Sequence, residues 1–226
     1  MNSTDLHRIF RSEVKDELRP FFWSDEDIFR YMNAAYREFV RLIGGVSDFT
    51  SEACEIKIIA GEAVGEIHKS VLRIMSVSAR STRADIRIIN STDLGKIRVG
   101  DYGAFTTLRL DDKEGPVQFG VIGMEKGKIR WINIPTQDDV ADAIVYRTPL
   151  CDITTFDQEF TDVEGDHHIH LLDGMKKYAY LKKDADTYDP KASDKAGIDF
   201  EAYALNVKAE NERYQHKTRE VAYGGL

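Results

Sequence analysis

The residues GDHHIH, at positions 165–170, are the stretch of this sequence best suited to chemistry. Four side chains that can bind a metal lie within five consecutive residues: Asp166, His167, His168 and His170. On a helix, His167 and His170 would share a face, and Asp166 would be a neighbour of His170. Three such ligands and a water molecule are the donor set of a catalytic zinc ion. The segment therefore raises the hypothesis of a metal-dependent hydrolase that uses Asp166, His167 and His170.

A structural interpretation of the same residues is simpler. The HExxH pattern of metalloproteases is absent, and the other histidines are scattered: His7, His68 and His216. Gly165 and Asp166 are typical of a helix start, with Asp166 as the N-cap and the histidines in the first turn. On this interpretation we expect no metal, no cofactor and no enzymatic activity.

Other motifs for binding or catalysis are weak or absent. The residues DADTYDP place Asp184, Asp186 and Asp189 close together, but the glycine and the final glutamate of a calcium-binding EF-hand loop are missing. We expect these aspartates to end one helix and to cap the next, with Pro190 at its first position. Glycine-rich phosphate loops and the GxSxG nucleophile motif are absent from the sequence.

The composition is that of a globular protein. The 226 residues, 42% of them hydrophobic and 31% charged, are enough for one large domain or two small ones. No apolar run approaches the ~20 residues that span a bilayer, and residues 1–20 contain no hydrophobic core of a signal peptide. We therefore expect synthesis in the cytoplasm and no membrane partner. Cys54 and Cys151 are expected to be free and buried, although a nucleophilic pair of Cys151 with a histidine is conceivable.

The negative charge is concentrated in the middle of the chain. The formal net charge is −8, and residues 46–165 carry 20 acidic and 14 basic side chains. Binding to the DNA backbone depends on lysine and arginine side chains that neutralise phosphates. The sequence has no basic stripe of this kind, so duplex DNA near this protein should be repelled rather than held.

Helices are predicted at both ends of the chain. Apolar residues recur at three- and four-residue spacing from Leu6 to Leu18, and Pro20 is expected to end this first helix. Ser24 is a strong N-cap for a second helix, which the glycines at 44–45 end. Two further helical patterns follow near the C-terminus, at residues 169–180 and 200–214.

Between these helices the apolar period changes to two. Strands are indicated within residues 55–67, 71–81, 84–89, 115–135 and 142–150. The clearest is a hairpin with its turn at Lys126-Gly127. We predict an α+β fold in which the N- and C-terminal helices form a bundle around an inserted antiparallel β-sandwich or barrel. The predicted domains are residues 1–48 with 164–226 for the bundle, and 49–163 for the β insert.

Two separated segments resemble head-to-tail adaptor proteins of tailed bacteriophages, also called connector or head-completion proteins. Those proteins typically begin with Trp-Ser/Thr-Asp-x-Glu/Asp, followed by a helix with Tyr/Leu-x-Asn-x-Ala. Here these motifs are Trp23-Ser24-Asp25-Glu26-Asp27 and Tyr31-Met32-Asn33-Ala34-Ala35. The later segment HHIHLLDGMKKYAYLKKDADTYDPKASDKAGIDFEAY, at 167–203, is similar to their C-terminal half. The resemblance covers both helical ends, about half of the chain. No motif of the β region matches these proteins.

The resemblance implies a structural virion protein rather than an enzyme. Such adaptors form a ring, commonly of twelve copies, that docks beneath the portal protein and joins it to tail tube, nozzle or fibre proteins. The genomic DNA passes through the channel of the ring without sequence-specific binding. In proteins of this type the histidine segment begins a structural helix. Another tail or baseplate protein is the alternative within the same class.

The C-terminal tail is the predicted contact segment. A segment that lacks a strong structural pattern can fold when it binds a partner. We therefore expect the tail to meet the portal or a neighbouring subunit through five residues: Glu212, Arg213, Tyr214, Arg219 and Tyr223.

Overall fold

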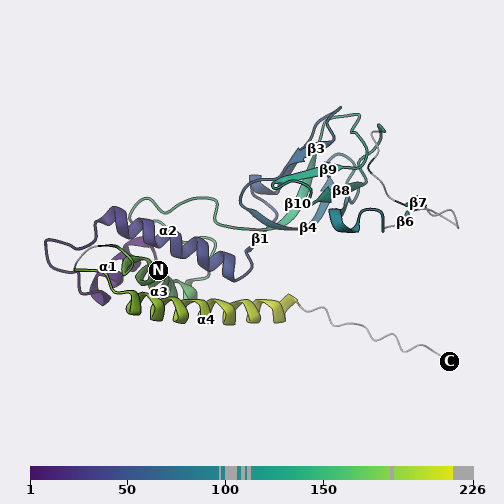
Figure 1. The fold of residues 1–226 in the computed structure, drawn as a ribbon. Helices are drawn as coiled ribbons and strands as arrows, with labels where there is room; N and C mark the ends of the chain where they lie inside the picture. The colour runs from purple at the N-terminus through teal and green to yellow at the C-terminus, as the bar shows by residue number, and fades with distance from the viewer. Residues whose placement is uncertain (97, 100–105, 108–109, 111–112, 184–185, 216–226) are drawn as a thin grey trace, which may run out of the picture. The chain divides into compact units, whose positions relative to one another are not determined.

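The computed structural model describes the chain except for residues 97, 100–105, 108–109, 111–112, 184–185 and 216–226. The chain divides into two compact units (Figure 1): a helical unit, residues 1–45 with 149–226, and a β unit, residues 46–148. Helix and sheet thus occupy separate parts of the chain, and the predicted α+β class is confirmed. In this division residues 149–163 belong to the helical unit, whereas the predicted β domain included them. The assignment of these parts as two domains stays a prediction.

The described part of the helical unit contains four α-helices: α1 (Ser3–Glu13), α2 (Asp25–Leu42), α3 (Leu171–Ala179) and α4 (Pro190–Gln215). Figure 1 shows α2, α3 and α4 side by side, so the two ends of the sequence share one core. Within the described residues, no helix has the length and apolarity needed to cross a membrane.

Helix α1 is shorter than the sequence indicated. The side chain of Asn2 caps its start by accepting the N–H of Asp5 at 2.9 Å. The predicted extension to Pro20 is wrong, because Lys15 has φ 59, a left-handed conformation that an α-helix cannot continue. As a consequence Leu18, which was expected on the apolar stripe, is 85% exposed.

Helix α2 begins as predicted. The Ser24 hydroxyl accepts the N–H of Asp27 at 3.1 Å and so satisfies one of the free donors of the first turn. The preceding residue, Trp23, is buried: its ring packs edge-on against Phe10 at 5.9 Å, and its indole N–H donates to the carbonyl of Ala179 at 3.3 Å. Trp23 therefore fixes the start of α2 against α1 and the end of α3.

The three long helices approach one another closely at Gly174. A Cβ atom at this position of α3 would lie 2.8 Å from the Cβ of Ala35 on α2, and 2.9 Å from the ring of Phe200 on α4. Real Cβ atoms do not approach other atoms this closely, so the absence of a side chain at Gly174 is what allows α2, α3 and α4 to pack together.

The described residues of the β unit form ten strands and two single turns of 3-10 helix, at Glu52–Cys54 and Ser91–Asp93. The first five strands are β1 (Val46–Asp48), β2 (Glu55–Ile58), β3 (Val64–Glu66), β4 (Val71–Ala79) and β5 (Arg87–Asn90). The others are β6 (Arg98–Val99), β7 (Thr106–Thr107), β8 (Phe119–Ile122), β9 (Lys128–Trp131) and β10 (Asp139–Arg147). The hairpin with its turn at Lys126-Gly127 is present as β8 and β9.

These strands form two four-stranded sheets and a separate β6–β7 pair. In the first sheet the long strand β10 is central, with β4 on one side and β1 and β2 on the other. The second sheet has the order β3-β9-β8-β5. Its β5–β8 pair is parallel, which corrects the all-antiparallel prediction. A parallel pair needs a long crossover, and residues 91–118 supply one.

One apolar core lies between the two sheets. Alternate residues of β10 point inward (Ala141, Ala143 and Val145), together with side chains of β2 and β4. From the second sheet, Ile129 and Trp131 of β9 enter the same cluster. Among the described strands no sheet closes into a barrel.

Candidate functional site

The histidine segment forms a turn of 3-10 helix at Gly165–His170, and α3 begins only at Leu171. The residue before this turn is Glu164, and no side chain caps either helix start. The predicted N-cap role of Asp166 is therefore wrong. The histidines occupy a tight turn that leads into α3 and not the first turn of an α-helix.

The most buried of the three rings belongs to His168. Its Nδ1 lies 2.9 Å from the carbonyl oxygen of Met1, and its Nε2 lies 2.8 Å from the carbonyl oxygen of Val163. Carbonyl oxygens only accept hydrogen bonds, so a ring nitrogen that carries a hydrogen donates to the carbonyl beside it. His168 therefore ties the N-terminus to the segment before α3, which is a structural role.

The other two rings pack on Tyr203 of α4. The Nδ1 of His167 lies 2.9 Å from the Tyr203 hydroxyl, and the His170 ring stacks on the Tyr203 ring with centroids 3.4 Å apart. The pKa of His170 is lowered because burial disfavours the charged ring. The nearby carboxylate of Asp173 acts in the opposite direction but does not outweigh burial. Within the described residues, no three histidine, cysteine, aspartate or glutamate side chains are arranged to hold a metal ion. The ligand set of Asp166, His167 and His170 is not assembled.

Asp189 caps α4 as the sequence predicted, whereas α3 already ends at Ala179, before the three aspartates. The carboxylate of Asp189 accepts the backbone N–H groups of Lys191 at 3.1 Å and Ala192 at 3.0 Å, with Pro190 as the first helical residue. Asp184 lies outside the described residues. Both cysteines are free; Cys54 is buried, but Cys151 is exposed, contrary to the prediction.

Helix α4 carries apolar side chains on two opposite faces. The inner face packs on α2 and α3 and contains Ala196, Phe200, Ala204 and Val207. The opposite face presents the α4 outer stripe, which we define as Ile198, Ala202, Leu205 and Ala209. Ile198 is 69% exposed and Leu205 is 55% exposed. Spacings of four, three and four residues are those with which one helix packs along another.

The outer stripe was not predicted, although the residues that form it recur at regular spacing in the sequence. Ala209 was grouped with Phe200 and Val207 as part of a single apolar face. Because 3.6 residues make one turn, Ile198 and Leu205 lie on the side of the helix opposite to Phe200. The angular positions of the apolar residues around α4 therefore separate the two faces.

The predicted contact segment continues from this stripe. Glu212 and Arg213 are exposed on the last turns of α4, and the Lys208 ammonium lies 4.0 Å from the Glu212 carboxylate. Tyr214 lies within α4, but the placement of its side chain is not described. Arg219 and Tyr223 fall outside the described residues. The described part of the segment is therefore a helix end whose side chains are open to solvent.

Comparison with known proteins gives one family. A family model described as SU10 adaptor protein matches residues 1–221 of the chain. No curated protein matches it. The match spans both helical ends and the β region, including the part of the sequence in which no motif resembled an adaptor.

Proposed function

The chain belongs to the SU10 adaptor protein family, and from this premise we propose that it is the head-to-tail adaptor in the neck of a tailed bacteriophage. In this proposal the protein is a structural component of the virion and not an enzyme. It is made in the host cytoplasm and docks as a ring, of about twelve copies as adaptors commonly form, beneath the portal. The ring joins the portal to tail tube, nozzle or fibre proteins and surrounds the channel for the genome.

The α4 outer stripe is the observation that carries the proposal. Two large apolar side chains, Ile198 and Leu205, stand exposed on a helix whose other face is already buried. Exposed apolar surface at helix-packing spacing is typical of an interaction site. In the proposed ring, a neighbouring copy covers this stripe, and the segment beyond Lys208 meets the portal.

The charge of the chain supports its place around DNA. Residues 46–165 carry 20 acidic and 14 basic side chains, and the segment 149–165 alone carries five acidic side chains and no basic one. An acidic surface does not bind phosphates and so would not retard a moving duplex. The proposed contact with genomic DNA is therefore passage through the channel without sequence-specific binding.

Truncation after Lys208 should lower the affinity for the portal at least tenfold. The deletion removes the exposed last turns of α4 and all five predicted contact residues, but it leaves the buried residues up to Val207 in place. Surface plasmon resonance on immobilised portal rings measures the effect. Unchanged affinity of a truncated chain with a normal melting temperature would show that the tail is not the portal contact.

The substitution Leu205→Asp should prevent ring formation on the portal. A charge in the middle of the outer stripe would have to be desolvated in the contact with the neighbouring copy. The matched control is Asn206→Asp, which introduces the same charge one residue away, on an exposed position outside the stripe. Analytical ultracentrifugation of portal mixed with each variant measures how many copies bind. If equal numbers of copies of the two variants bind to the portal, the outer stripe is not part of the contact between neighbouring copies.

A further inference from the structure

Strand β4 has two irregularities in its pairing with β10. The register shifts between Ile144 and Val145 and again between Tyr146 and Arg147, where the β4 partners step from Ser76 to Ile74 and from Arg73 to Val71. Met75 and Leu72 are therefore the two residues of β4 that the ladder skips. A residue at a β-bulge is left unpaired and its side chain is re-aimed.

Both skipped residues are large, apolar and exposed. Met75 is 53% exposed and Leu72 is 45% exposed; Ile144, the partner of Ser76 on the outer face of β10, is 44% exposed. Arg73 stands between them, with its guanidinium 4.6 Å from the centre of the Tyr146 ring. We name Leu72, Arg73, Met75 and Ile144 the β4 knob.

The bulges also determine how the β4 edge can bind a partner. In the described part of the chain, residues 71–75 pair with β10 alone, whereas the end of β4 also bonds to residues 84–86. Bulges along a free edge disturb the row of N–H and C=O groups that a further strand would need. A contact at this edge must therefore be made by side chains.

A groove of about 690 Å³ lies beside β2 and β3 of the same unit. Its apolar lining includes Ile59 and Val64, both exposed, and its acidic lining includes Glu62 and Glu66. Lysines line it too, and one of them, Lys128, pairs with Glu125 at 2.6 Å. We name this cavity the β2–β3 groove.

The knob and the groove are complementary in chemistry. Each combines exposed apolar side chains with charge: Arg73 is the cationic residue of the knob, and glutamates outnumber lysines, four to three, in the lining of the groove. Among the described residues, Arg73 of the knob makes a ring contact but no ion pair, and Glu62 of the groove makes none either. An apolar contact flanked by opposite charges favours association in one register.

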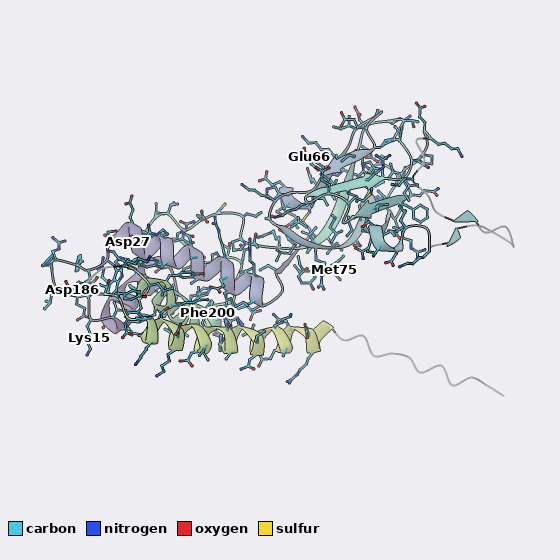
Figure 2. All side chains as sticks on the ribbon, viewed as in Figure 1. Lys15, Asp27, Glu66, Met75, Asp186 and Phe200 are labelled. Atoms are coloured by element: carbon cyan, nitrogen blue, oxygen red, sulfur yellow. The ribbon has the colours of Figure 1, made fainter. Side chains whose placement is uncertain are left out.

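The two surfaces lie at opposite sides of the β unit. Strands β4 and β2 flank β10 on its two sides, and β3 is the edge of the second sheet that lies next to β2. Figure 2 shows the labelled Met75 and Glu66 at opposite sides of this unit. Two different, complementary surfaces on opposite sides of one body are what a head-to-tail ring requires.

We propose that the β units of neighbouring copies pack head to tail, with the β4 knob of one copy in the β2–β3 groove of the next. The occupant of the groove is thus a second copy of this chain. The inference rests on the proposed ring and adds a specific contact to it. The β units would close the ring through side chains alone, without a continuous intermolecular sheet.

Disulfide cross-linking on the portal tests the contact. The full chain with Cys151→Ser is the parent, since Cys54 is buried. Adding Met75→Cys and Val64→Cys places one thiol on the knob and one in the groove. After assembly on portal rings and oxidation, we expect a ladder of covalent multimers in a denaturing gel. The control replaces Val64→Cys by Thr82→Cys, an exposed position in the turn after β4 and outside the groove.

The outcomes separate the contact from the adaptor function. A ladder for the knob–groove pair, and none for the control pair, supports the inference. Rings that dock on the portal but give no ladder above the control overturn it and leave the adaptor function intact. A parent chain that forms no ring on the portal counts against the adaptor function itself, and the inference falls with it.

Charge reversal provides a second measurement without cysteines. Arg73→Glu and Glu62→Arg should each weaken assembly on the portal about tenfold, which is the scale for a close charge pair at an interface. The double variant should recover most of the loss, because the opposite charges face each other again. Losses that simply add in the double variant would contradict a direct contact between these residues.

Discussion

Replacing Arg147 by methionine should lower the free energy of unfolding of the β unit by about 3–5 kcal/mol. Arg147 on β10 forms a buried ion pair with Asp48 on β1, and the carboxylate also accepts the N–H groups of Thr50 at 2.9 Å and Ser51 at 3.2 Å. Methionine fills a similar volume but provides no charge. The variant therefore leaves a buried carboxylate without its counter-ion.

The pH dependence of this loss has a definite sign. Burial disfavours the charged form of Asp48, but hydrogen bonds from Ser51, Arg147 and Thr50 outweigh it and hold the pKa of this carboxyl well below its usual value. A depressed pKa contributes stability above the unfolded-state pKa of about 3.9, and this contribution is lost as the pH falls further. The difference between wild type and variant should therefore be full at neutral pH and should shrink under acid conditions below about pH 4.

Urea denaturation followed by tryptophan fluorescence, at neutral and at acid pH, measures this difference. The control is Arg80→Met, which removes an exposed arginine paired with Asp142 and Glu55 and should change stability little. If both variants lose the same free energy of unfolding, or if the loss in Arg147→Met does not change with pH, the Asp48–Arg147 ion pair is not the cause of the loss.

Replacing Phe200 by alanine should destabilise the helical unit by about 3–5 kcal/mol, the usual cost of removing a buried aromatic ring. The side chain, labelled in Figure 2, is fully buried. It fills the space that Gly174 leaves open on α3, and its ring lies 6.0 Å from that of Phe39 on α2. Removing the ring would leave a cavity between α2, α3 and α4. The three helices could close this cavity only by moving together.

The control for this prediction is Ile198→Ala on the same helix. Its side chain is exposed on the α4 outer stripe, so the stability of the isolated chain should change by no more than about 0.5 kcal/mol. Thermal unfolding followed by circular dichroism at 222 nm compares the two. A melting temperature of Phe200→Ala as high as that of the control would mean that α4 does not share a core with α2 and α3.

Local patterns in the sequence predicted most of the elements. Period-two runs marked the strands of the β unit, and the hairpin turn at Lys126-Gly127 is where it was predicted. The caps of two helices were also identified, because Ser24 and Asp189 bind backbone N–H groups only two or three residues away. In each case the interaction lies within a few residues, so a short stretch of sequence contains it.

Features that depend on distant residues were not predictable in this way. The parallel pairing of β5 with β8 and the contact of His168 with Met1 join residues far apart in the chain. The early end of α1 depends on one backbone angle at Lys15, a residue type with no preference for the left-handed region.

The candidate site was predicted only in part. The sequence favoured a structural role for the histidine segment. The structure shows the contacts through which its rings pack. Arg219 and Tyr223 of the predicted contact segment lie outside the described residues. The α4 outer stripe was missed because the helix is apolar on two opposite faces. With apolar residues on both faces, the sequence does not show a single apolar period. The β4 knob depends on bulges that only the pairing register reveals.

Electron microscopy of purified portal rings mixed with the full chain tests the adaptor function most directly. We expect a second ring of density, coaxial with the portal and on its tail-facing side, with helical units and β units both resolved. Portal rings that remain bare at micromolar concentrations of the chain, or that bind it without rotational symmetry, would contradict the account.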